Sequence, residues 1–471
     1  MREIVGRNRE KSKINDIVNS SKSEFVAVFG RRRVGKTFLI KEYFNNDFSL
    51  YITGANDATL ENQLYNFNVV LQKTFPNKHF EISKTWFEAF NQLIKCLEQS
   101  RKAKKIIFID ELPWLDTPKS NFLSALDYFW NYWASGRKDI VLIVCGSSAS
   151  WMIKKILKNT GGLHNRVTAI MKVDPFTLSE TEQFLKSKKI VFNRHQIIEL
   201  QMILGGIPYY LEALKKGKSL AQNIDEICFE KTGILIDEFD NLYASLFKNH
   251  ENHIQVIEAL SKKNIGLNRE TILKNTNIKD GGTFTKILEE LEQSGFIRKY
   301  DYFGATKKAG LYQLIDFYSL FYYNFQKNNK QENYWSANID NPKHRIWSGY
   351  SFELLCLLNS DNIKKALGIS GISANISSWK SKNSESSAQI DLIFDRRDQI
   401  VTVCEMKYSL NKFVIDKKYA ENLRNKIGSF RNESKTKKAI HLAMVTTFGT
   451  LENENYFDLV QNNITMDCFF E

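Results

Sequence analysis

Proline, cysteine and long apolar runs are scarce in this chain of 471 residues. Only six prolines occur, which excludes a proline-rich linker, and no segment is of low complexity or repeats at a fixed period. The six cysteines form no Cys-x-x-Cys pair, so the sequence indicates neither a disulfide framework nor a cysteine zinc site. No stretch approaches the roughly 20 apolar residues of a membrane span, and residues 1–6 lack the apolar region of a signal peptide. We therefore expect a cytoplasmic protein with no membrane partner.

Positive charge is in excess, with a formal net charge of +13. A polyanionic partner such as DNA explains this excess, but a composition rich in lysine, asparagine and isoleucine also arises in AT-rich genomes. Hydrophobic residues make up 43% of the chain and charged residues 25%, which is typical of globular domains. At about 150 residues per domain, the length suggests roughly three domains.

A glycine-rich turn follows an apolar strand pattern near the start of the chain. Phe25-Val-Ala-Val-Phe29 runs into a loop made of Gly30, Arg31, Arg32, Arg33, Val34, Gly35, Lys36 and Thr37. Such a loop directs backbone N–H groups and a helix N-terminus at one anion, and its glycines let a phosphate approach closely. Lys36 would reach the β- and γ-phosphates of ATP, and the Thr37 hydroxyl would ligate Mg²⁺. The alternative is a basic surface turn.

A second strand pattern ends in two carboxylates, in Lys104-Lys-Ile-Ile-Phe-Ile-Asp110-Glu111. Asp110 at a strand end would hold Mg²⁺ through water, and Glu111 would polarise an attacking water. Alone, this pair is also common in surface turns. Its position downstream of the phosphate loop predicts the hydrolytic site of an ATPase.

Two later segments add candidate site residues. The strand pattern at 139–146 is followed by Ser147 and Ser148, where a hydroxyl would touch the γ-phosphate or orient the water. Gly161-Gly-Leu-His-Asn-Arg166 forms a loop before another strand pattern. Arg166 is a candidate finger that enters the site of a neighbouring subunit in a homo-oligomer. A plain exposed arginine is the alternative.

Strand and helix patterns alternate over residues 1–177. We expect strands near 25–29, 48–53, 105–110, 139–145 and 168–173. This alternation predicts an α/β fold with a parallel sheet between helices, and a ligand at the carboxyl ends of the strands. Residues 178–247 have helical patterns broken at Gly205-Gly-Ile-Pro208, which predicts a helical lid.

These residues resemble the AAA+ ATPases, and in particular their archaeal-type branch. The resemblance rests on Ile4-Val-Gly-Arg7 with Glu10, the loop at 30–37, Asp110-Glu111-Leu-Pro-Trp, Gly146-Ser-Ser and Leu204-Gly-Gly-Ile-Pro208-Tyr-Tyr-Leu211. It implies that ATP and Mg²⁺ are bound, and it extends over nearly the whole chain. The lid turn shows no obvious arginine where other AAA+ proteins carry a sensor.

A winged helix is predicted within residues 248–330. Three short helix patterns precede strand patterns at 295–300 and 311–314, with a loop at Phe303-Gly-Ala between them. The recognition helix would begin near Thr283. It carries Glu289, Glu290 and Glu292 against Lys286. Because phosphates repel carboxylates, an interdomain or oligomer role is favoured over specific DNA reading.

An aromatic stripe follows at helical spacing, formed by Tyr318, Phe321, Tyr322 and Phe325. Such a stripe either stacks nucleic-acid bases or forms a buried helix face. The spacing favours the buried face.

Carboxylates and a lysine gather in residues 331–471. Asp391 lies on one strand pattern, and Glu405 and Lys407 lie on the next, so a hairpin would bring them together. Two carboxylates would hold Mg²⁺ at a phosphodiester, and Lys407 would orient or deprotonate the water. Glu353, on a preceding helix pattern, would add a ligand.

This arrangement resembles the PD-(D/E)xK nuclease superfamily, with Ile390-Asp391 in place of the family's nominal Pro-Asp. The resemblance implies an α/β restriction-endonuclease-like domain that acts on DNA. A salt-bridged surface hairpin and a nuclease fold without cutting activity are the alternatives. Basic residues that would track a phosphate backbone follow, namely Lys412, Lys417, Lys418, Arg424, Lys426, Arg431, Lys435, Lys437 and Lys438.

Together these patterns predict an ATP-hydrolysing protein that controls a DNA-directed, metal-dependent nuclease. Two rival interpretations remain open. One is an ATP-driven switch that does not cut, and the other is a transcription regulator that uses the winged helix.

Overall fold

The computed structural model describes residues 3–158, 163, 165–304, 310–329, 331–381 and 388–471. The chain divides into two compact units, Met1–Pro175 and Phe176–Glu471, which are described separately. The boundaries that the sequence suggests near residues 247 and 330 stay predictions. Among the described helices, none combines the length and the low polarity needed to cross a bilayer.

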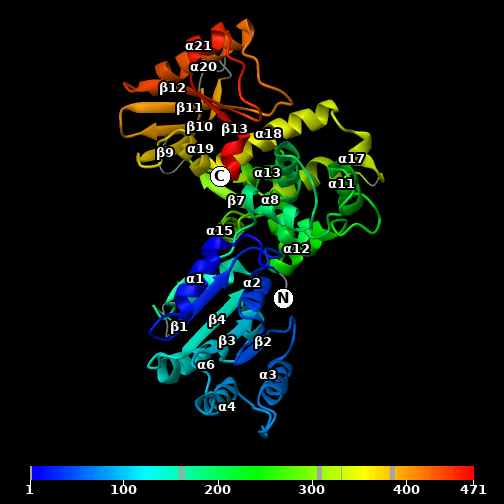
Figure 1. Cartoon of the computed structure of the whole chain (residues 1–471), viewed down its shortest axis with the longest axis vertical. Helices are drawn as coiled ribbons and strands as arrows, with labels where there is room; N and C mark the ends of the chain where they lie inside the picture. The colour runs from blue at the N-terminus through cyan, green and yellow to red at the C-terminus, as the bar shows by residue number, and fades with distance from the viewer. Residues whose placement is uncertain (1–2, 159–162, 164, 305–309, 330, 382–387) are drawn as a thin grey trace. The chain divides into compact units, whose positions relative to one another are not determined.

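Five parallel strands form the sheet of the first unit, in the order β2-β3-β4-β1-β5 (Figure 1). They are β1 (Glu24–Phe29), β2 (Leu50–Thr53), β3 (Lys105–Asp110), β4 (Ile140–Gly146) and β5 (Ala169–Lys172). Every residue of β1, β3 and β4 is buried, which explains why these strands read as continuous apolar runs rather than as alternating patterns. The predicted parallel α/β fold is confirmed, with strand ends that differ by one or two residues.

Helices cover this sheet and supply most of its core. They are α1 (Asn8–Val18), α2 (Lys36–Tyr43), α3 (Leu60–Thr74), α4 (Trp86–Glu98), α5 (Leu112–Leu115), α6 (Phe122–Tyr128), the π-helical η1 (Phe129–Ala134), α7 (Ala149–Met152) and the π-helical η2 (Ile153–Leu157). Helix α4 buries Ala89, Phe90, Leu93 and Leu97, which recur at three- and four-residue spacing on one face. Because of this amphipathic pattern, the apolar face of α4 packs against the strands.

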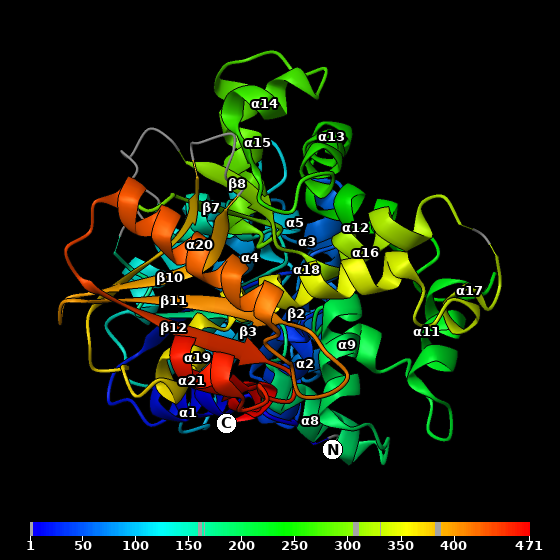
Figure 2. The same ribbon diagram turned by 90° about the horizontal axis from the view of Figure 1, so that it is seen from above.

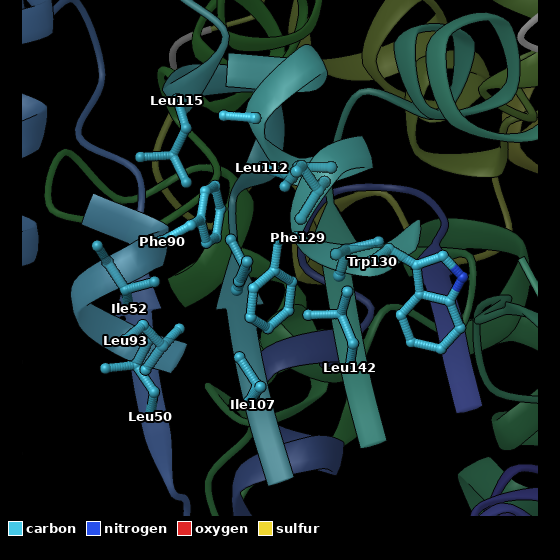
Figure 3. Packing of buried hydrophobic residues seen from close by; sticks show 14 of the residues in the cluster. Leu50, Ile52, Phe90, Leu93, Ile107, Leu112, Leu115, Phe129, Trp130 and Leu142 are labelled. Atoms are coloured by element: carbon cyan, nitrogen blue, oxygen red, sulfur yellow. The ribbon is translucent and has the colours of Figure 1, made fainter. Parts of the chain in front are cut away.

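Aromatic side chains dominate the core between α4, η1 and the sheet. The rings of Phe90 and Phe129 stack with 5.2 Å between their centroids. Figure 3 shows both rings among the aliphatic residues that project from the strands, such as Ile107 and Leu142. The carboxyl ends of the strands are thereby held on a rigid base.

Helices open the second unit, followed by a small sheet. The helices are α8 (Leu178–Ser187), α9 (Arg194–Leu204), α10 (Pro208–Leu211), α11 (Leu220–Cys228), α12 (Glu238–Leu246), α13 (His250–Ser261), α14 (Arg269–Lys274) and α15 (Gly282–Gln293). The strands β6 (Leu267–Asn268), β7 (Ile297–Tyr300) and β8 (Leu311–Leu314) pair antiparallel in the order β6-β8-β7. The end of the expected loop at Phe303-Gly-Ala lies outside the described residues.

The aromatic stripe belongs to a buried helix. Its residues lie on α16 (Phe317–Phe321) and on the π-helical η3 (Tyr322–Gln326). Tyr318, Phe321 and Phe325 are buried, and the Tyr322 ring stacks on Phe239 at 4.0 Å. The stripe therefore packs inside the second unit instead of offering a surface for bases.

A second five-stranded sheet forms the C-terminal part, in the order β13-β12-β11-β10-β9. Its elements are α17 (Tyr334–Ala337), α18 (Pro342–Leu358), α19 (Ser360–Ala366), β9 (Ala374–Lys380), β10 (Gln389–Arg396), β11 (Ile400–Lys407), α20 (Lys417–Ser434), β12 (Ala439–Thr446), α21 (Glu454–Leu459), β13 (Val460–Thr465) and the 3-10 helix η4 (Met466–Phe470). Strands β9, β10 and β11 are antiparallel, whereas β11, β12 and β13 are parallel. Helix α20 lies across β10, β11 and β12 (Figure 2). Its Leu423 and Phe430 are buried in one core cluster with residues of these strands.

The aromatic core of the first unit predicts a large loss of stability for Phe129→Ala. Removing this fully buried ring should lower the free energy of unfolding by about 3–5 kcal/mol, because transfer and cavity terms add. Denaturant titration followed by tryptophan fluorescence measures the change. Tyr132→Ala is the matched control, because its ring is 70% exposed on the same helix. Equal losses in the two variants would show that this cluster does not hold the unit together.

Candidate functional site

The loop at residues 30–35 connects β1 to α2 and leaves the start of α2 open. Gly30 has a φ of 153°, and a Cβ there would lie 2.1 Å from the Val173 carbonyl oxygen. Gly35, with a φ of 87°, is the N-cap residue of α2, and no side chain caps that helix end. The first N–H groups of α2 are therefore directed out of the helix, as anion binding requires.

Lys36 lies inside this loop with its amino group on backbone carbonyls. The side chain is buried, and Nζ donates hydrogen bonds to the carbonyl oxygens of Gly30 (3.0 Å) and Arg31 (2.8 Å). Burial lowers the pKa of Lys36, and the carboxylates of Glu111 and Asp110 are among the groups that oppose this effect. A buried amino group with two neutral acceptors is suited to an incoming phosphate, which offers it negative charge.

The Thr37 hydroxyl donates a hydrogen bond of 2.7 Å to Oδ2 of Asp110. Asp110 ends β3 and is almost fully buried, and its Oδ1 accepts the Glu111 N–H at 3.0 Å. A threonine hydroxyl and a carboxylate at this distance form the donor set that Mg²⁺ takes beside a bound nucleoside triphosphate. The residues present therefore fit both ATP and Mg²⁺.

Glu111 is held by Ser147. The backbone of Glu111 is left-handed, with a φ of 45°, which is unusual for a residue with a side chain. Its Oε2 accepts hydrogen bonds from the Ser147 hydroxyl at 2.9 Å and from the Ser147 N–H at 3.3 Å. The structure pairs Ser147 with this carboxylate, and the contact with the γ-phosphate or the water that the sequence suggests stays a prediction.

Arg7 is a further residue of this site, to which the sequence assigned no role. Its guanidinium donates hydrogen bonds to the carbonyl oxygens of Val34 (2.9 Å) and Asp174 (2.7 Å). Arg7 thus ties the start of the chain to the phosphate loop. Its position in the Ile4-Val-Gly-Arg7 pattern was the only sequence signal for it.

The arginines of the site region differ in exposure. Arg31 is buried, whereas Arg32 and Arg33 are partly buried beside it in the loop. Arg166 is exposed, and its N–H donates to the Leu163 carbonyl oxygen at 3.2 Å. Residues 161, 162 and 164 of the expected arginine loop lie outside the described residues.

In the C-terminal sheet, the structure brings Asp391 and Glu405 onto adjacent strands. Leu392 of β10 pairs with Cys404 of β11, so Asp391 and Glu405 are next in the same antiparallel register. Nζ of Lys407 lies 3.2 Å from Oε1 of Glu405.

Positive charge and a phenol surround Glu405. Its Oε2 accepts a 2.6 Å hydrogen bond from Lys426 of α20, and its Oε1 accepts one from the Tyr419 hydroxyl. Burial raises the pKa of Glu405, but Lys426, Lys407 and these hydrogen bonds outweigh it, so the pKa lies below its usual value. Glu405 is therefore a carboxylate already neutralised by two lysines.

Asp391 and Glu353 have the opposite environment. Burial raises the pKa of Glu353 to about 8, and the nearby charge of Asp391 adds to this effect. Burial also raises the pKa of Asp391. The side-chain amide of Gln389 donates a hydrogen bond to Oδ1 of Asp391. These two buried carboxylates repel each other, and a cation between them would relieve that repulsion.

A metal ion would find only a partial ligand set here. In the described part of the chain, no three His, Cys, Asp or Glu side chains lie close enough to share one ion. Mg²⁺ usually takes one or two carboxylates and completes its shell with water and phosphate oxygens. Asp391 with Glu405 therefore fits Mg²⁺ only as a pair, and Glu405 would have to exchange its lysine partners for it.

Sequence reasoning missed the roles of Gln389, Tyr419 and Lys426. Lys426 was grouped with the basic residues of the surface, because nothing in its spacing from Glu405 indicates a contact. Gln389 stands two residues before Asp391 on β10, which was a usable signal for a side-chain partner.

Comparison with known proteins assigns a class to the N-terminal part. Residues 4–214 match the model of an ATPase domain found predominantly in Archaea. An uncharacterized protein of Methanocaldococcus jannaschii, MJECL04, is 27% identical over 325 residues, which are 68% of either chain. Residues 4–214 are therefore similar to an ATPase domain of the archaeal type.

Two solved structures are similar at lower identity. The Walker-type ATPase PABY2304 of Pyrococcus abyssi is 16% identical, with a TM-score of 0.49, and the match covers 67% of this chain and 95% of that one. The ORC2 protein of Aeropyrum pernix, in ADPNP-ADP complexes, is 13% identical, with a TM-score of 0.42, and the match covers 66% and 90%.

The contact between Ser147 and Glu111 leads to a prediction for Ser147→Ala. Loss of the hydroxyl should lower kcat for ATP hydrolysis about tenfold, since a hydrogen bond to a charged group is lost, and should leave ATP affinity within about twofold. Steady-state ATPase assays and nucleotide titrations measure both quantities. Ser147→Thr, which keeps the hydroxyl, should restore most of kcat. A raised KM with unchanged kcat would mean that Ser147 serves the phosphate, as the sequence suggested.

Proposed function

We propose that this protein binds and hydrolyses ATP at residues 30–37 and that its nucleotide state controls a DNA-directed activity of the C-terminal part. The observation that carries the first half is one cluster at the carboxyl ends of β1, β3 and β4. It combines the open N-terminus of α2, the buried Lys36, the Thr37–Asp110 pair and the Glu111–Ser147 pair.

Each residue then has one task. Lys36 leaves the loop carbonyls to hold the β- and γ-phosphates, and the loop N–H groups bind the same anion. Glu111, oriented by Ser147, accepts a proton from the water that attacks the γ-phosphorus. Thr37 and Asp110 would hold Mg²⁺, which would supply positive charge against the phosphates. Arg166 is exposed, which suits a residue that reaches the site of a second subunit. If Arg166 acts in this way, mixing Arg166→Ala protein with Glu111→Gln protein should restore part of the lost ATPase activity.

The DNA-directed half of the proposal is supported by exposed basic residues of the C-terminal part. Lys412, Lys417, Lys418, Arg431, Lys435 and Lys437 are exposed. Three other basic residues of this region have carboxylate partners: Arg424 with Asp458, Lys426 with Glu405 and Lys438 with Asp395. We assign the exposed set to the phosphate backbone of DNA and the paired set to the fold.

The segment with α13, α14, α15 and the sheet β6-β8-β7 has the element order of a winged helix, and we propose that it is one. Its third helix, α15, uses Glu290 internally, since that carboxylate lies 2.9 Å from Nε2 of His253 and 3.6 Å from Nζ of Lys286. An acidic helix engaged with its neighbours favours a role between domains over reading of the DNA major groove.

Two forms of the C-terminal activity are open to experiment. A metal-dependent nuclease would use Asp391, Glu405 and Lys407, with Glu353 beside them. A switch that binds DNA without cutting is favoured by one observation, the neutralisation of Glu405 by Lys407 and Lys426. The nuclease is supported by the position of Asp391 and Glu405 on adjacent strands.

Variants of the nucleotide site test the first half. Lys36→Ala should abolish nucleotide binding, because the phosphates lose the buried amino group of the loop. Glu111→Gln should bind ATP with parental affinity and hydrolyse it about 10²- to 10⁴-fold more slowly, since only the proton acceptor is lost. Isothermal titration with ATP and phosphate-release assays measure these effects. Parental turnover in Glu111→Gln would refute the assignment of the base.

Asp391→Ala separates the nuclease from the switch. If the protein is a nuclease, cleavage of plasmid or single-stranded DNA should require a divalent ion, stop in EDTA and disappear in Asp391→Ala. ATP hydrolysis should stay within about twofold, because Asp391 is far from the phosphate loop in the sequence and has no part in the proposed ATP site. Asp398→Ala is the matched control, since Asp398 lies in the turn between β10 and β11 and its carboxylate pairs with Arg396. A parent that binds DNA but neither cleaves it nor binds Mg²⁺ or Mn²⁺ would establish the switch.

A further inference from the structure

A cavity of about 640 Å³ lies beside the carboxylates Glu353 and Asp391 in the second unit. One wall comes from β7 and β8 with the turn after α13, and the other comes from α18 with the edge of the C-terminal sheet. Glu405 and Lys407 do not line it. Any substrate that reaches Asp391 from this side therefore has to fit a space with protein on both sides.

Arg298 gives this cavity an unpaired positive charge. Its Nε donates a 2.8 Å hydrogen bond to Gln313, and its guanidinium carbon lies 4.8 Å from the centre of the Tyr300 ring. No carboxylate in the described part of the chain forms an ion pair with Arg298, although the side chain is partly buried. A guanidinium in such a place is costly without an anion, and its planar donors match two phosphate oxygens.

Aromatic groups line the space around this charge. Tyr300, Tyr302, Trp347 and Tyr350 all border the cavity. The indole Nε1 of Trp347 is buried, and no hydrogen-bond acceptor for it lies within the described residues. Flat rings next to a cation are the surface on which unpaired bases stack, whatever the base.

The walls of the cavity are joined to each other. Tyr302 forms an isolated β-bridge with Ser378 of β9, and the Phe303 N–H donates to the Ser378 carbonyl oxygen at 2.7 Å. The Phe303 ring packs edge-on against Phe430 of α20 at 5.1 Å. Because these contacts hold the β7–β8 side against the C-terminal sheet, the cavity keeps its size.

Duplex DNA does not fit this space. The two grooves of a duplex are about 8.5 and 7.5 Å deep, so a duplex is more than roughly 16 Å across, and a cube of that edge far exceeds the cavity volume of about 640 Å³. A single nucleotide with its phosphate does fit, since cavities of this size usually hold one small molecule.

We propose that the cavity holds one nucleotide of an unpaired DNA strand, with its phosphate on Arg298 and its base against the tyrosines. The next phosphodiester then lies beside Asp391 and Glu353. This inference rests on the proposed function, because it takes DNA as the partner of the C-terminal part, and it names unpaired strands as the class of substrate.

Binding assays in EDTA, which prevents cleavage, test the proposal on the full chain. Fluorescence anisotropy measures the Kd of a labelled single-stranded oligodeoxynucleotide, and competition with a closed circular duplex gives the Kd of the duplex. The single strand should bind at least about tenfold more tightly than the duplex. Arg298→Gln should weaken single-strand binding by about tenfold or more, because a charged hydrogen bond to phosphate is lost. Lys299→Gln is the matched control, since Lys299 is exposed on the same strand and does not line the cavity.

Tyr350→Ala keeps the test valid if Arg298→Gln does not fold. The Tyr350 ring is 48% exposed, so its removal should leave the fold intact and weaken single-strand binding about fivefold or more. Equal affinity for single strand and closed duplex, or parental binding in the folded variants, would overturn the cavity assignment and leave DNA as a partner.

A failure of the proposed function itself has a different outcome. If the full chain binds no DNA of any form, both proposals fail together. Titration with a deoxynucleoside monophosphate then tests whether Arg298 binds the phosphate of a free nucleotide. Binding of the monophosphate that is lost in Arg298→Gln would replace the unpaired strand with a free nucleotide as the ligand.

Discussion

The parallel register of β1, β4 and β3 is the constraint on which the nucleotide site depends. Phe29 is level with Gly146, and Ile109 is level with Val144, so Asp110 and Glu111 end their strand beside the end of β4. Only in this register does Ser147 reach Glu111 while Thr37, the second residue of α2, reaches Asp110. A shift of one residue would send the two carboxylates to the wrong faces of the sheet. The aromatic core beneath the strands holds this register, because close packing resists sliding.

The two carboxylate sites of the chain solve the same electrostatic problem in different ways. Asp110 and Glu111 are satisfied by hydroxyl and N–H donors, which leaves the positive charge of Lys36 for a ligand. Glu405 is instead satisfied by lysines, which leaves the site with little charge to offer a metal. Asp391 lies between these cases, held by a neutral amide and raised in pKa by burial. The contrast explains why the geometry supports the proposed ATPase chemistry more directly than the proposed chemistry of the C-terminal part.

Much of the first unit was predictable from the sequence. Fully buried strands give unbroken apolar runs, and the glycine-rich turn has one physical solution, so both the parallel sheet and the position of the phosphate loop follow from local pattern. The helical spacing of the aromatic stripe likewise favoured burial, and Tyr318, Phe321 and Phe325 are buried. The partners of the site carboxylates were not predictable. Ser147 and Glu111 are 36 residues apart, and Tyr419 and Lys426 reach Glu405 from α20, the helix between β11 and β12.

The sequence by itself determined the alternation of strands and helices in the first unit, and it named the candidate residues for binding phosphate or metal. These properties depend on residues that are close together in the chain, so the local sequence pattern is enough to predict them. Only the tertiary structure decided which donor each carboxylate accepts, which of the basic residues are already paired, and that Arg298 and Asp391 border one cavity. Those properties depend on contacts between distant segments, whose distances are set by packing and have no counterpart in residue spacing.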